Sequence, residues 1–141
     1  MDRKRAMLTI RELITVPPRV VRAGASVVDA AKLMKGEDAG LAPIVDEGRL
    51  VGVVTDRDIV VKVIAEGRDP HTTRVDDIGS FRVFTIDPDQ QLDEALRLMT
   101  MHGVWRLPVV EEDGRLVGIV AREDVERHAI DDLQLVGQIA E

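Results

Sequence analysis

Apolar and polar residues follow helix and strand spacings in the first half of the chain. Residues 26–35 carry apolar side chains at helical spacing, and Ser26 and Asp29 form a capping-box pattern at the start of this stretch. Residues 43–45 and 50–54 are rich in β-branched side chains and flank an acidic turn. This pattern predicts an amphipathic helix followed by a hairpin of two short strands.

A second helix is predicted after the hairpin, over about 56–65. Gly67 and then Pro70 follow it, and this order is typical of a helix end. Another strand is predicted before the first helix, near 19–21. The segment 67–73 is polar and contains the same glycine and proline, which indicates a linker.

The same order of elements recurs about 65 residues later. Pro43-Ile44-Val45 reappears as Pro108-Val109-Val110, and the run 48–54 reappears as 114–120. Self-similarity of this kind indicates a duplicated structural unit. The elements expected in the second copy are a strand at 83–86, a helix at 92–101, strands at 107–110 and 116–120, and a helix from Arg122 onward.

The repeat predicts mixed α and β structure (α/β or α+β) with two pseudo-symmetric units, each a small three-stranded sheet with flanking helices. A unit of about 60 residues is too small to bury both faces of its sheet alone, so we expect the two units to pack together. The expected bounds are 9–66 for the first unit, 67–73 for the linker, 74–128 for the second unit and 129–141 for a C-terminal helix or tail.

Composition and charge limit the kinds of partner and the cellular compartment that we expect for this protein. The 141 residues include 19 basic and 26 acidic side chains, for a net charge of −7, which disfavours a nucleic-acid partner. Cysteine is absent, which excludes disulfides and fits a reducing compartment. No apolar run approaches the roughly 20 residues of a membrane-spanning helix, and residues 1–12 lack a signal-peptide pattern. We therefore expect a cytoplasmic protein that has no membrane partner.

The strongest candidate for chemistry is the strand-to-helix turn Gly52-Val53-Val54-Thr55-Asp56-Arg57-Asp58. Thr55 is a good N-cap, and Asp58 lies in the first turn, where a negative charge is favourable, so a purely structural role explains both residues. The same geometry suits a ligand, because N–H groups and a hydroxyl at a helix N-terminus can bind phosphate. A carboxylate one turn into the helix can accept hydrogen bonds from ribose. The residues by themselves leave both interpretations open.

Other patterns do not indicate catalysis or a metal. The chain shows no nucleophile paired with a base and no glycine-rich P-loop, so we expect no enzyme activity and no catalytic cofactor. His71, His102 and His128 are too widely spaced for a helical metal pair, and no metal site is expected. Trp105 fits either stacking on adenine or a contact between two modules.

The duplicated pattern resembles a tandem pair of CBS domains, the arrangement called a Bateman module. The resemblance rests on two ordered copies of a Pro-Val-Val-like strand followed by a Gly-x-x-Thr-x-x-Asp turn, and it covers about 9–128. The runs 55–62 and 67–70 also resemble bacterial two-CBS-domain proteins of the hypoxic-response type.

The resemblance implies a non-catalytic regulatory sensor. Such modules bind an adenosine-containing ligand such as AMP, ADP or ATP in the cleft between the two domains and transmit the ligand state by a conformational change. The motif Asp binds ribose and the motif Thr binds phosphate, which carries over to Asp58 and Thr55, with Arg57 between them. Residues just before the Pro-Val-Val strand line the adenine or phosphate side. In this chain they are Gly40 and Leu41 in the first copy and Trp105 and Arg106 in the second.

The second copy departs from the pattern. Ala121 stands where the first copy has Thr55, while Asp124 keeps the ribose-type carboxylate, so we expect one nucleotide per chain rather than two. Two alternatives remain: a dimerisation or protein-interaction module with degenerate clefts, and a binder of S-adenosylmethionine or a dinucleotide. Such modules commonly pair through their helices, so a homodimer is expected, and the sequence does not identify the effector protein.

Overall fold

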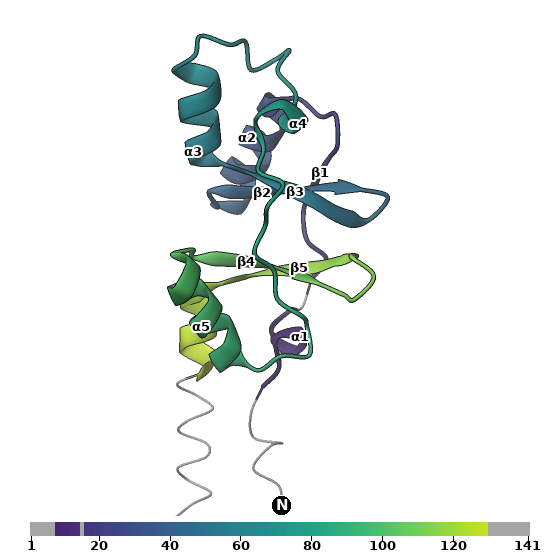
Figure 1. Cartoon of the computed structure of the whole chain (residues 1–141), viewed down its shortest axis with the longest axis vertical. Coiled ribbons are helices and arrows are strands. Elements are labelled where there is room, and N and C mark those ends of the chain that lie inside the picture. The colour runs from purple at the N-terminus through teal and green to yellow at the C-terminus, as the bar shows by residue number, and fades with distance from the viewer. Residues whose placement is uncertain (1–7, 15, 130–141) are drawn as a thin grey trace, which may run out of the picture. The chain divides into compact units, whose positions relative to one another are not determined.

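The computed structural model describes residues 8–14 and 16–129, which divide into two compact units (Figure 1). One unit, here the first-repeat unit, comprises 19–83. The other, the second-repeat unit, combines the described residues up to Pro18 with those from Phe84 to Ala129.

The first-repeat unit packs helices against a three-stranded sheet of order β1-β2-β3. Strand β1 pairs parallel with β2, and β2 pairs antiparallel with β3. The tight turn between β2 and β3 ends at Gly48, whose φ is +81°, and helix α3 continues directly into a π-helix. The elements are β1 (Val21–Arg22), α2 (Val27–Glu37), β2 (Leu41–Asp46), β3 (Arg49–Thr55), α3 (Asp56–Ile59), the π-helix Val60–Ile64 and α4 (Val75–Ile78).

The core of this unit follows the predicted apolar pattern. Helix α2 starts at the predicted cap, where the Ser26 hydroxyl accepts a hydrogen bond from the Asp29 backbone N–H at 3.2 Å. Its buried face meets Ile44 and Val54 of the sheet and Val63 of the π-helix. These aliphatic contacts hold the start of α3 in place, and the candidate site lies there.

The second-repeat unit is built from α1 (Ile10–Leu13), α5 (Leu92–His102), β4 (Arg106–Val110), β5 (Leu116–Ala121) and helical residues 122–129. Strands β4 and β5 form an antiparallel pair. The strand predicted at 83–86 is reduced to a single parallel bridge between Ile86 and Val109, so this sheet has two strands rather than three. Only Ile86 of that stretch is buried, whereas Phe84 is exposed and stacks on His102. The mixed α and β fold class is confirmed.

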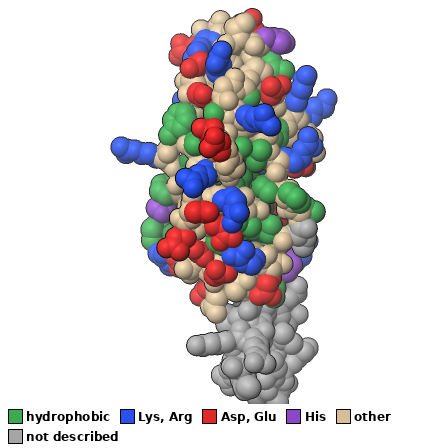
Figure 2. Space-filling model, turned by 90° about the vertical axis from the view of Figure 1, so that its right-hand side faces the viewer, with side chains coloured by type: hydrophobic (Ala, Val, Ile, Leu, Met, Phe, Trp, Pro, Cys, Tyr) green, Lys and Arg blue, Asp and Glu red, His purple; other side chains and the backbone are tan. Residues whose placement is uncertain are grey.

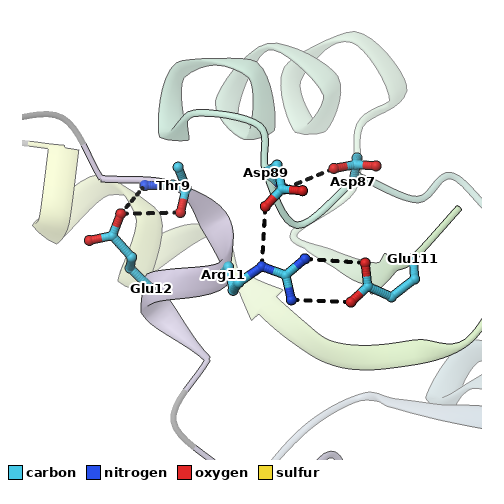
Figure 3. Close-up of polar contacts among 6 residues, drawn as sticks. All are labelled: Thr9, Arg11, Glu12, Asp87, Asp89 and Glu111. Carbon is cyan, nitrogen blue, oxygen red and sulfur yellow. Dashed lines mark hydrogen bonds and ion pairs between the residues drawn. The ribbon is translucent and has the colours of Figure 1, made fainter. Parts of the chain in front are cut away.

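Two short helices that the sequence pattern did not predict, α1 and α4, occupy matching places. Arg74, before α4, bridges to Ser26 at the start of α2, and Thr9, before α1, bridges to Gln91 at the start of α5. Arg11 of α1 forms a fork with both carboxylate oxygens of Glu111, and its Nε donates to Asp89 at 3.1 Å (Figure 3). These bonds, the one to Glu111 foremost, raise the pKa of Arg11 above its ordinary value.

The compact units of the structure divide between Pro18 and Arg19 and between Val83 and Phe84. Within the first-repeat unit, Thr73 is buried and its carbonyl accepts a hydrogen bond from the Val27 N–H at 2.9 Å. The domain bounds expected from the sequence, with a linker at 67–73, stay a prediction. The expected tail at 129–141 lies outside the described residues from position 130.

Acidic and basic side chains are interspersed over the face that Figure 2 shows. Among the described residues, no helix has the length and apolar character that crossing a bilayer requires.

Candidate functional site

The junction of β3 and α3 carries a reciprocal capping box. The Thr55 hydroxyl accepts a hydrogen bond from the Asp58 N–H at 3.1 Å, and one Asp58 carboxylate oxygen accepts one from the Thr55 N–H at 3.0 Å. The two motif residues that the sequence singled out therefore fix each other. As an acceptor in this box, the Thr55 hydroxyl keeps its own O–H available as a donor.

Asp58 has a second partner that the sequence analysis did not single out. Its other carboxylate oxygen lies 3.0 Å from Lys62 Nζ, and the Asp58 side chain is only 13% exposed. The signal was present in the sequence, since residues four apart on a helix face the same side and an acid placed before a base favours an ion pair. Lys62 is therefore a site residue that the spacing could have identified.

The predicted residues Gly40 and Leu41 lie beside this junction. Leu41 pairs with Thr55 across the hairpin, and the Gly40 carbonyl accepts a hydrogen bond from the Asp56 N–H at 2.9 Å. A Cβ on Gly40 would lie 2.7 Å from a carboxylate oxygen of Asp56, so a larger residue here would require the exposed Asp56 side chain to move. The Arg57 side chain is exposed next to the same turn. The structure thus brings together all five residues that were predicted for the first copy.

The glycine of the motif has a packing role in both copies. A Cβ on Gly52 would lie 2.7 Å from the Ser80 carbonyl oxygen, and one on Gly118 would lie 2.8 Å from the Ile14 side chain. In each unit, the segment that follows the short helix passes directly over this glycine. The glycine therefore shapes the strand that leads into the junction, and nothing requires it to touch a ligand.

The second-repeat junction is built differently. Arg106 pairs with Ala121 across the β4–β5 hairpin, and the Trp105 carbonyl accepts a hydrogen bond from the Arg122 N–H at 2.8 Å. The Arg122 guanidinium lies over the Trp105 ring, 5.3 Å from its centroid, and Trp105 is 69% exposed. The predicted residues Trp105 and Arg106 are thus adjacent, with an arginine in place of the first copy's Asp56.

Asp124 does not reproduce the geometry of Asp58. Ala121 has no hydroxyl to cap the helix, and the Asp124 carboxylate pairs with Arg127 on the surface, where its side chain is 51% exposed. The charge of Asp124 is thus neutralised on the solvent side of the helix. The two junctions are chemically unequal, as the motif departure indicated.

Two surface concavities of the first-repeat unit lie elsewhere. One, of about 330 Å³, is lined by residues of β1 and α2, including Arg19 and Leu33. The other, of about 370 Å³, is lined by residues 22, 23 and 45–48 around the β2–β3 turn. Neither of these two concavities includes Thr55 or Asp58.

Comparison with known proteins agrees with the duplicated architecture. The CBS domain family matches residues 10–65 and 75–131. Hypoxic response protein 1 of Mycobacterium tuberculosis is 37% identical over 123 residues, which cover 86% of this chain and 85% of the relative. The crystal structure of Hypoxic Response Protein I with two coordinated zinc ions aligns with a TM-score of 0.77 at 37% identity, over 86% of this chain and 98% of that one.

A second solved structure contains adenosyl ligands. The CBS domain pair of protein MJ0100, in complex with 5′-methylthioadenosine and S-adenosyl-L-methionine, aligns with a TM-score of 0.74 at 30% identity, over 86% of this chain and 94% of that one. It shares the architecture derived above for the duplicated units.

Zinc ions are part of the solved Hypoxic Response Protein I structure. Across 8–14 and 16–129, no three His, Cys, Asp or Glu side chains gather at a metal-binding distance, and the chain has no cysteine. His71 contacts Asp69, His102 stacks on Phe84, and His128 contacts the backbone of Asp124. The repeat, the fold of each unit and these matches lead to one conclusion: the chain belongs to the CBS domain family as a tandem pair of CBS domains, a class of regulatory module.

Proposed function

We propose that this CBS pair binds an adenosine-containing ligand, of the AMP, ADP or ATP type, at the Thr55–Asp58 junction, and that it acts as a non-catalytic sensor. The observation that carries the proposal is the geometry of Asp58, whose carboxylate is largely buried, fixed in place and charged. A carboxylate in this state suits the hydroxyl groups of a ribose, because hydrogen bonds to an ionised acceptor are stronger than neutral ones.

The remaining parts of an adenosine ligand find matching groups nearby. The Thr55 O–H is free to donate to a phosphate oxygen, because the Thr55 hydroxyl acts only as an acceptor in the capping box. The exposed Arg57 adds a positive charge beside the turn. The proposed assignment is ribose on Asp58 and phosphate on Thr55, with Gly40 and Leu41 flanking the ligand.

One specific observation favours a second candidate ligand. The MJ0100 pair, at 30% identity, is solved with 5′-methylthioadenosine and S-adenosyl-L-methionine. These ligands share the ribose but carry no phosphate, so they would use Asp58 and leave Thr55 without its phosphate partner. A module with degenerate clefts is the contrasting candidate, supported by Ala121 and by the solvent-side pairing of Asp124.

Calorimetric titration with AMP, ATP and S-adenosylmethionine tests the proposal. We expect saturable binding by the wild type, a loss of about tenfold or more in affinity for Asp58→Asn, and little change for the matched control Asp124→Asn. Asparagine keeps an oxygen for the Thr55 N–H, so a circular-dichroism melt should confirm a folded variant. Absence of binding by the wild type at millimolar concentrations of all three compounds would reject the sensor proposal.

We also propose that the chain self-associates. The π-helix leaves an apolar stripe of Val60, Val61 and Ile64 exposed, and exposed apolar stripes of this kind mark protein contacts. Light scattering of the purified chain tests this proposal. We expect a molar mass of at least two chains, and the mass of a single chain would contradict the proposal.

A further inference from the structure

Lys62 connects the proposed ribose site to another element of the first-repeat unit. Its Nζ lies 3.0 Å from one carboxylate oxygen of Asp58 and donates a second hydrogen bond, at 3.1 Å, to the carbonyl oxygen of Ile78 at the end of α4. Residues 58 and 62 are one turn apart, whereas residues 62 and 78 meet only through the fold. The ammonium group is therefore held from two sides.

The hydrogen bonds of Asp58 leave a defined capacity for a ligand. An ionised carboxylate has two oxygens with about four lone-pair positions in all. The Thr55 N–H occupies a position on one oxygen, and Lys62 Nζ occupies a position on the other. Each oxygen thus keeps acceptor capacity for one more donor, and the two hydroxyls of a ribose supply two donors side by side.

We infer that Lys62 is a positioning residue, which holds the Asp58 carboxylate so that both of its oxygens face the vicinal diol of a ribose. This inference rests on the proposed function and extends it, because it makes discrimination between ribose and deoxyribose depend on a residue that need not touch the ligand. Thr55 restrains only one oxygen of the carboxylate. Lys62 restrains the other, which prevents rotation about the Cβ–Cγ bond.

The second-repeat unit supplies an internal comparison. His128 stands at the position equivalent to Lys62, and its Nδ1 lies 2.8 Å from the backbone oxygen of Asp124 rather than from the carboxylate. Without a basic partner on the inner side and without a capping hydroxyl, the Asp124 carboxylate pairs with Arg127 instead. The two units thus differ both in the residue four positions after the motif aspartate and in the partners of the aspartate's carboxylate.

The test compares adenosine with 2′,3′-dideoxyadenosine as probes on the full chain. Both nucleosides are uncharged, so a change in the net charge of the protein affects them alike, and the ratio of their dissociation constants isolates the diol contacts. The wild type is expected to prefer adenosine by about tenfold or more, as two hydrogen bonds to a charged acceptor require. In Lys62→Met and Lys62→Gln the ratio should fall to about threefold or less through weaker adenosine binding, while dideoxyadenosine binding stays unchanged.

Two controls separate positioning from a general structural effect. Lys62→Arg keeps the charge and the donors and should restore most of the ratio, and Lys35→Met, at the exposed end of α2, should leave it unchanged. Gln keeps a donor for the Ile78 carbonyl, so it gives the comparison even if Met unfolds the unit. An unchanged ratio in a folded Lys62→Gln variant would overturn the inference, whereas a wild type that binds neither adenosine nor AMP, ATP or S-adenosylmethionine would overturn the proposed function itself.

Discussion

Replacing Ile10 by alanine tests whether the N-terminal helix is an integral part of the second-repeat unit. Ile10 lies in the four-residue helix α1, and its side chain is 0% exposed. It belongs to the core that also contains Leu92, Met99 and Val109. A helix of this length has no stability of its own, because nucleating one turn costs more than its few hydrogen bonds return. Its position must therefore come from these contacts.

The expected loss of unfolding free energy follows from the complete burial of the Ile10 side chain. The substitution removes Cγ1, Cγ2 and Cδ1 from a fully buried site, and each buried methylene contributes about 0.8 kcal/mol. The transfer part of the loss is then roughly 2–3 kcal/mol, and the cavity left behind brings the total to about 3 kcal/mol. Domains of this size are stable by only about 5–15 kcal/mol, so the effect would be easily measured.

Urea unfolding of the wild type, Ile10→Ala and the control Val16→Ala gives the comparison. Val16 is 69% exposed in the same segment, so its truncation should change the free energy of unfolding by less than about 0.5 kcal/mol. Native-state hydrogen exchange locates the effect, with faster exchange expected in α5 and β4. A loss under about 1 kcal/mol for Ile10→Ala, or faster exchange confined to α2, would refute the assignment of α1 to the second-repeat unit.

Two further predictions concern the start of the helix after β5 and the stability of the fold at acid pH. Ala121→Thr should restore a capping hydroxyl opposite Asp124 and raise the free energy of unfolding by about 1 kcal/mol, as chemical denaturation would show; no gain would mean that the Asp124 N–H is out of reach of a residue-121 hydroxyl. The hydrogen bond from Arg97 holds the pKa of Glu94 below its ordinary value. This pair therefore stabilises the fold at a pH above the ordinary pKa of a glutamate, and its contribution is lost as the pH falls through the lowered pKa. Glu94→Gln should therefore flatten the decline of stability on acidification, and an unchanged profile between pH 3 and 6 would contradict this.

The local elements could be predicted because their signals lie close together in the chain. The cap of α2 at Ser26 depends on a bond to a residue three positions away, and so does the capping box of Thr55 and Asp58. Both hairpins were found near their observed bounds, since β-branched runs on either side of an acidic turn specify them. The duplicated order of these elements was enough to identify the family.

The sequence indicated residues of the candidate site, but it did not indicate the direction or the partners of their side chains. The motif singled out Thr55 and Asp58, the family resemblance implied Gly40 and Leu41, and the structure brings these residues together at one junction. The pairing of Asp124 with Arg127 was outside the reach of the motif, which keeps the same aspartate in both copies. Side-chain direction depends on which partners surround a carboxylate, and the spacing of a motif does not contain this information.

The sequence by itself determined the repeat, the long helices, the hairpins and the capping residues, all through contacts between near neighbours in the chain. The tertiary structure decided where α1 and α4 pack, where the chain divides into units, and that Lys62 reaches the carbonyl of Ile78. It also reduced the strand predicted at 83–86 to a single bridge at Ile86. The physical reason is common to these cases: a four-residue helix or a one-residue bridge gains too little from its own hydrogen bonds to form alone, so distant residues that bury its side chains determine its place.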